Sequence, residues 1–91
     1  MPRPYTVVRL AEFDNDTLIL DAERRALVRA AVLLLRTDPK RAVGVFPVYV
    51  DRSSGWEQRL LVFPDDRGVL EYSVEEYERV IVLYRVRWAN H

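Results

Sequence analysis

Val80-Ile81-Val82-Leu83-Tyr84-Arg85-Val86-Arg87-Trp88 lies near the end of a sequence of 91 residues and decides its fold. β-Branched and aromatic residues dominate this run, which is typical of a strand. Two more strand-like runs precede it, at Trp56 to Phe63 and Val69 to Val74, and the loops between them are short. Three consecutive strands joined in this way predict an antiparallel meander.

The first half of the chain predicts one strand and one helical segment. Tyr5 to Leu10 reads as a strand, which the run Asp14-Asn15-Asp16 is expected to break. Thr17 to Leu20 fits a short helix or an extended stretch equally well. Asp21 can cap a helix from about Ala22 to Arg36, because apolar residues recur there at i, i+3 and i+4.

The predicted helix carries more apolar surface than one stripe needs. Leu27, Ala30, Ala31, Leu34 and Leu35 make the expected core stripe, with Arg25, Arg29 and Arg36 toward the opposite face. Val28, Val32 and Leu33 extend the apolar surface beyond that stripe. We therefore expect either a neighbouring helix or a partner chain, a second copy included, to cover this flank.

The segment from Ala42 to Val50 predicts an irregular edge strand, because Gly44 and Pro47 interrupt its apolar run. Such an edge invites a strand or an amphipathic helix from another chain. With the meander, these elements predict an α+β fold in a single domain spanning residues 1–91. An N-terminal strand and a helical segment (one long helix or a helical hairpin) precede an antiparallel meander of three to four strands packed on the helix.

Composition excludes several classes of function. Cysteine is absent and the one histidine is His91, which argues against a metal site, a disulfide or a nucleophilic triad. No glycine-rich phosphate loop occurs, so we expect no cofactor. Fourteen basic residues balance fourteen acidic ones, so nucleic-acid binding would need a local patch. No apolar run is long enough to span a membrane and no signal peptide is evident, so a cytoplasmic location is expected.

Strand periodicity assigns faces to the last strand. Val80, Val82, Tyr84, Val86 and Trp88 are expected on the face that packs on the helix. The intervening residues then lie on the other face, which carries two arginines that look unpaired.

These arginines give the candidate site, on an exposed sheet face and its rim. The candidate catalytic residues are Arg59, Arg85 and Arg87. The candidate substrate-binding residues are Glu57, Glu71, Trp88 and His91. Arginines beside aromatic rings suit phosphate contact and base stacking. A general base would have to be Glu57 or Glu71 with a pKa raised by burial.

A plainer interpretation explains the same residues. Arg85 and Arg87 opposite Glu57 or Glu71 would form cross-strand salt bridges on a solvated face. We favour that interpretation over catalysis.

Several short motifs carry a resemblance to a known family. Ser54-Gly55-Trp56-Glu57-Gln58-Arg59-Leu60 is similar to an aromatic-to-Arg strand, and Val69-Leu70-Glu71-Tyr72-Ser73-Val74 to an Arg-Leu-Val-Tyr-x-Val strand, of the RelE/ParE toxin superfamily. Asp38-Pro39 matches the usual connector, and Val80 to Trp88 the closing strand. The order of elements also resembles this superfamily, most closely its YoeB/Txe-like branch, over most of the chain.

The catalytic positions of that family are mostly substituted here. In the register that matches Tyr72, the catalytic Arg falls on Val69, the general-base Glu on Phe46, and the terminal His-Tyr pair on Arg87-Trp88. Of the motif positions only Arg59 retains the expected residue type. Neither Arg nor Trp can act as an acid or base at neutral pH.

The resemblance implies one of three alternative functions. The first is the toxin-like component of a type II toxin–antitoxin module, with a cognate antitoxin partner and metal-independent cleavage of mRNA on the ribosome. The second is a ParE-like inhibitor that binds gyrase without chemistry. The third is a catalytically silent binding module of the same fold.

Overall fold

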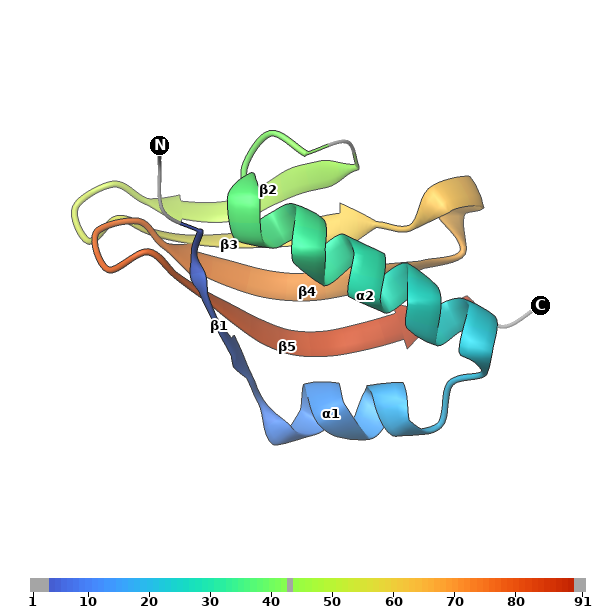
Figure 1. The fold of residues 1–91 in the computed structure, drawn as a ribbon. Coiled ribbons are helices and arrows are strands. Elements are labelled where there is room, and N and C mark those ends of the chain that lie inside the picture. The colour runs from blue at the N-terminus through green and yellow to red at the C-terminus, as the bar shows by residue number, and fades with distance from the viewer. Residues whose placement is uncertain (1–3, 43, 90–91) are drawn as a thin grey trace.

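The computed structural model describes residues 4–42 and 44–89, which form one sheet and two α-helices (Figure 1). The elements are β1 (Thr6–Arg9), α1 (Ala11–Leu18), α2 (Ala22–Thr37), β2 (Val45–Asp51), β3 (Trp56–Val62), the 3-10 helix η1 (Pro64–Asp66), β4 (Gly68–Glu75) and β5 (Val80–Trp88). The predicted α+β class, with a strand, two helices and a meander, is confirmed.

The strand order in the sheet is β1-β5-β4-β3-β2. β2 to β5 pair antiparallel in sequence order, while β1 runs parallel to β5 and closes the other edge. α2 crosses one side of the sheet, and α1 lies beside β5 at the far edge (Figure 1). We call the side under α2 the helix face and the opposite side the open face.

α2 begins and ends where the sequence predicts. The Asp21 carboxylate caps it by accepting a hydrogen bond from the Arg24 backbone N–H at 2.9 Å. Its buried residues are Val28, Ala31 and Leu35. The expected core positions Ala30 and Leu34 are instead exposed, because the stripe that packs on the sheet is rotated toward Val28 and Val32.

α1 corrects the prediction for the segment before Asp21. Asp14-Asn15-Asp16 does not interrupt the secondary structure but lies within this helix. The helix buries Phe13, which is only 2% exposed. The helix forms against the residue preferences because β5 supplies contacts for it. The helical hairpin is therefore the form that the segment takes. Neither helix of the described residues is long and apolar enough to cross a membrane.

The core lies between α2, α1 and the helix face. Leu35, Leu70, Tyr72, Ile81 and Leu83 have no exposed surface. Phe13, Phe63 and Val74 extend the same cluster. The buried apolar residues of these elements thus form one cluster.

A bulge in β5 corrects the predicted faces of that strand. Glu71 pairs with Arg85 but its neighbour Tyr72 pairs with Leu83, which leaves Tyr84 unpaired. One extra residue moves the following side chains to the other side. Ile81 and Leu83, expected outside, therefore face α2. The prediction was wrong for the even-numbered residues before the bulge (Val80, Val82 and Tyr84) and right for Val86 and Trp88 after it.

β2 is the irregular edge strand that the sequence predicts. Its register shifts between Pro47 and Tyr49, and no strand pairs with its outer side among the described residues. The exposed side chains are apolar, namely Phe46, Pro47, Val48, Tyr49 and Val50. Val43, within the predicted edge strand, lies outside the described residues.

Candidate functional site

Arg87 lies on the open face. Its Nε donates a hydrogen bond to Glu71 Oε2 on the neighbouring strand at 2.9 Å. The Arg87 side chain is 60% exposed and that of Glu71 is 26% exposed. The cross-strand salt bridge predicted for this pair is confirmed, and it leaves Arg87 the most accessible of the three candidate arginines.

Arg85 forms an ion pair that the sequence did not indicate. Its Nε and Nη2 donate to the two carboxylate oxygens of Asp16 on α1, at 2.8 and 3.1 Å. The same carboxylate accepts the backbone N–H of Val86 at 2.9 Å. The hydrogen bond from Arg85 lowers the pKa of Asp16 below its usual value. Asp16 thus accepts a backbone N–H on the edge of β5 at a point that β1 does not reach.

Arg59 lies on the helix face, near the end of α2. It pairs with Glu57 at 3.0 Å and donates to the backbone oxygen of Lys40 at 3.2 Å. Lys40 bridges Glu57 at 2.6 Å and Glu76 at 3.1 Å, and the Tyr5 hydroxyl donates to Glu76 at 2.8 Å. We call these five residues the ion cluster.

The three candidate arginines therefore do not share one face, as had been expected. Arg59 on β3 lies directly across from Tyr72 on β4, so both side chains point to the same side of the sheet. The Tyr72 side chain reaches under α2 to the backbone oxygen of Pro39. Glu71 and its partner Arg87 point to the other side of the sheet, because neighbouring residues of a strand alternate. The expectation failed because the register of β3 with β4 sets Arg59 beside Tyr72 on the helix face, whereas Arg85 and Arg87 keep their predicted place on the opposite side.

Trp88 is also on the helix face. Its ring stacks on Phe63 with centroids 4.6 Å apart and an angle of 14° between the ring planes. The Arg24 guanidinium lies 5.6 Å from the Trp88 ring centroid. Trp88 is therefore engaged in packing on the side opposite Arg87. His91 lies outside the described residues.

The two carboxylates of the ion cluster are weak bases. Burial would raise the pKa of Glu57, but hydrogen bonds from Lys40 and Arg59 outweigh burial and lower this pKa below its usual value. Burial opposes the hydrogen bonds of Tyr5 and Lys40 at Glu76 in the same way, and the pKa of Glu76 is lowered too. General-base catalysis needs a pKa near the working pH. These groups are therefore suited to ion pairing.

Stability should fall in acid because of these carboxylates. Their folded pKa values lie below the unfolded ones, so the stabilisation is present above the unfolded pKa of about 4.3 and is lost as the pH falls through the folded pKa. Urea denaturation should give a constant midpoint from about pH 7 to about pH 5.5 and a lower one at about pH 3. Glu57→Gln should flatten this dependence. A midpoint that rises on acidification would contradict the assignment.

No group of three or more His, Cys, Asp or Glu residues that could hold a metal occurs within residues 4–42 and 44–89. Burial raises the pKa of the Tyr72 hydroxyl above its usual value. Tyr72 therefore stays protonated and donates its hydrogen bond to Pro39.

A groove of about 530 Å³ between α1 and α2 is the feature that sequence reasoning missed. Its lining is Arg9, Phe13, Thr17, Leu18, Arg25, Val28, Arg29, Val32, Leu33 and Arg36. The signal was present in the sequence, since the extra apolar flank of α2 and its arginines meet here. The missing information was the helical state of α1, which forms the second wall.

Comparison with solved structures identifies the architecture. A chain of the RelE–RelB complex from Pyrococcus horikoshii OT3 superposes with a TM-score of 0.80 at 13% identity, over 93% of this chain and 94% of that one. This chain has the RelE toxin fold. The RelBE2 toxin–antitoxin complex of Mycobacterium tuberculosis gives a TM-score of 0.69 at 21% identity, over 98% of this chain and 95% of that one.

The isolated RelE toxin of E. coli superposes on this chain with a TM-score of 0.55 at 15% identity, over 96% of this chain and 86% of that one. Comparison with protein-family models and with curated protein sequences gives no match. The similarity is therefore one of fold.

Proposed function

We propose that this chain is the toxin-like component of a type II toxin–antitoxin module and is held by an antitoxin protein. The observation that carries the proposal is the match to the Pyrococcus chain over almost the full length of both. Two of the similar structures are toxin–antitoxin complexes. The uncovered edge of β2 and the groove beside α1 offer this chain surfaces for such a partner.

We further propose that the chain acts by binding a target rather than by cutting RNA. The sequence suggested Arg59, Arg85 and Arg87 for cleavage of mRNA on the ribosome. Each of these arginines pairs with a carboxylate, and Arg59 lies on the opposite face from Arg87. The carboxylates Asp16 and Glu57 have lowered pKa values, which suits them poorly as general bases.

The second candidate function is cleavage of mRNA through an atypical site. In that case the chain would be a member of the YoeB/Txe-like branch. The accessible guanidinium of Arg87 favours it, because an exposed arginine on a sheet can contact phosphate. The binding form includes a ParE-like inhibitor of gyrase and a silent binding module.

Induction in a bacterial host tests the proposal. We expect growth arrest that is relieved when the neighbouring small open reading frame is co-expressed, with a tight complex on purification. Messenger RNA ends mapped by primer extension should be unchanged, because Lys40 and Arg59 lower the pKa of the candidate base Glu57. The readouts are growth, mRNA integrity and induction of the DNA damage response.

The double variant Arg85→Ala/Arg87→Ala separates the alternatives. Cut mRNA that disappears in this variant, while it persists in the control Arg41→Ala/Arg52→Ala, would support the nuclease and contradict the binding proposal. Normal growth together with no complex would overturn the module assignment.

A further inference from the structure

The groove between α1 and α2 combines an apolar floor with a cationic rim. Phe13 and Val28 form buried parts of the floor, at 2% and 4% exposure. Leu18 and Leu33 border it and remain 70% and 63% exposed. Apolar side chains exposed to this extent beside a groove are typical of an interaction surface.

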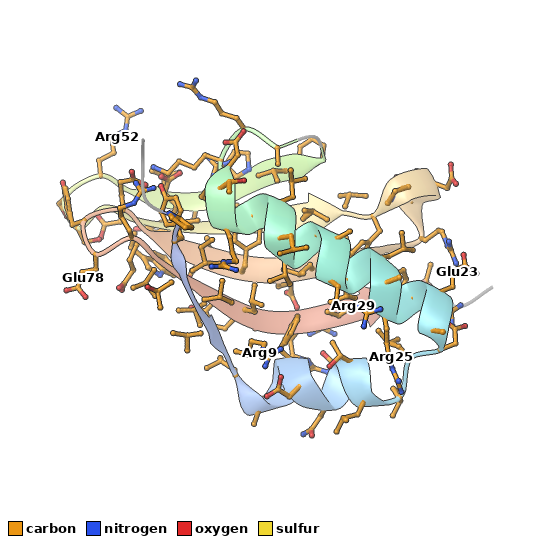
Figure 2. The ribbon with its side chains drawn as sticks, viewed as in Figure 1. Arg9, Glu23, Arg25, Arg29, Arg52 and Glu78 are labelled. Carbon is orange, nitrogen blue, oxygen red and sulfur yellow. The ribbon has the colours of Figure 1, made fainter. Side chains whose placement is uncertain are left out.

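The rim carries four arginines and no acidic residue, namely Arg9, Arg25, Arg29 and Arg36. Arg9 is 3.6 Å from Asp14, and Arg25 donates to the backbone oxygen of Leu18 at 3.1 Å. The side chains of Arg29 and Arg36 have no hydrogen-bond or ion-pair partner in the described part of the chain. Figure 2 shows Arg9, Arg25 and Arg29 in the space between the two helices. The groove therefore presents unneutralised positive charge on a chain whose net charge is zero.

We propose that this groove binds an acidic amphipathic helix of a partner protein. Apolar side chains of that helix would cover Leu33 and the floor, while its carboxylates pair with Arg29 and Arg36. Helix-in-groove recognition uses this division between an apolar stripe and its charged flanks. The identification of the partner as an antitoxin rests on the proposed function.

The spacing of the arginines sets the length of the partner helix. Arg29 and Arg36 are seven residues apart on α2, which is about two turns or ~10 Å along the axis. Arg25 extends the row to about 16 Å. A partner helix of about three turns, with carboxylates about two turns apart, matches the row.

Other occupants fit the groove less well. A nucleic acid would satisfy the arginines but would set phosphates against the exposed Leu18 and Leu33. A second copy docked through the same groove would place arginines against arginines, which is repulsive. An acidic helix satisfies both the apolar floor and the charge.

A direct binding assay tests the groove with the full chain. The probe is a fluorescein-labelled synthetic peptide of 15 residues, helical, with leucines on one face and glutamates flanking it. Fluorescence anisotropy should show binding that weakens between about 50 and about 300 mM salt. Arg29→Glu/Arg36→Glu should weaken binding roughly tenfold or more. Leu33→Asp should also weaken it, since Leu33 borders the floor.

The matched control is Arg41→Glu/Arg52→Glu, which makes the same change in net charge at two exposed arginines outside the groove. Arg52 lies in the turn between β2 and β3, away from α1 (Figure 2). Binding within twofold of the unmodified chain is expected for this control, with circular dichroism confirming that all variants are folded. Equal loss in both doubles, no binding of the peptide, or tighter binding of a 15-nucleotide single strand at the same arginines would overturn the proposal.

Failure here differs from failure of the proposed function. A complex with the neighbouring gene product that survives Arg29→Glu/Arg36→Glu unchanged would refute the groove assignment and leave the module standing. A chain that binds the acidic peptide but neither arrests growth nor binds the neighbouring product would support the groove and refute the module.

Discussion

Glu57→Ala should destabilise the protein by about 3–5 kcal/mol, because it leaves two cations of the ion cluster without their shared carboxylate. The side chains of Glu57 and Arg59 are only 11% and 12% exposed, so water replaces the lost contacts poorly. Lys40, at 31% exposure, would lose its 2.6 Å contact as well. Urea denaturation at neutral pH measures the change in the free energy of unfolding.

Glu78→Ala is the matched control for this effect. Glu78 is exposed in the connection between β4 and β5, at one end of the molecule (Figure 2). Its removal should change stability by less than about 0.5 kcal/mol. Similar losses in the two variants would show that Glu57 is not a buried anchor for the cations.

Leu83→Ala should destabilise the protein by about 2–5 kcal/mol through the cavity it leaves in the core. Leu83 has no exposed surface and faces α2, since the bulge follows it in β5. The measurement is again urea denaturation, with thermal unfolding as a second readout.

Val82→Ala tests the bulge in the same strand. Val82 lies on the open face and is partly exposed, so its truncation should cost no more than about 1 kcal/mol. Unbroken alternation along the strand, as the sequence predicted, would reverse the order of the two effects. A larger loss at Val82 than at Leu83 would contradict the register.

The sequence predicted the strands, the long helix and the irregular edge because local patterns specify them. Asp21 precedes a 3.6-residue pattern, and Pro47 marks the edge strand. The bulge after Leu83 has no such mark, since Tyr84 fits a regular strand as well. α1 was predicted only as an alternative, because its Asp-rich centre favours a turn unless β5 is beside it.

Of the contacts at the predicted site, the sequence indicated only those between neighbouring strands. Arg87 and Glu71 lie on neighbouring strands, so strand alternation was enough to pair them. Asp16 and Arg85 are 69 residues apart, and Tyr5 and Glu76 are 71 apart, so only the fold brings them together. Unpaired arginines in a sequence are therefore weak evidence for a free cationic surface.

The parallel pairing of β1 with β5 has a consequence for biosynthesis. Thr6 meets Val80 across the sheet, so β1 has no neighbouring strand until β5 has been synthesised. Contacts between such distant parts of a chain form late and slow folding. β1 and α1 therefore have no place to dock while β2 to β4 are being made, and a product truncated before β5 would leave both elements without their contacts.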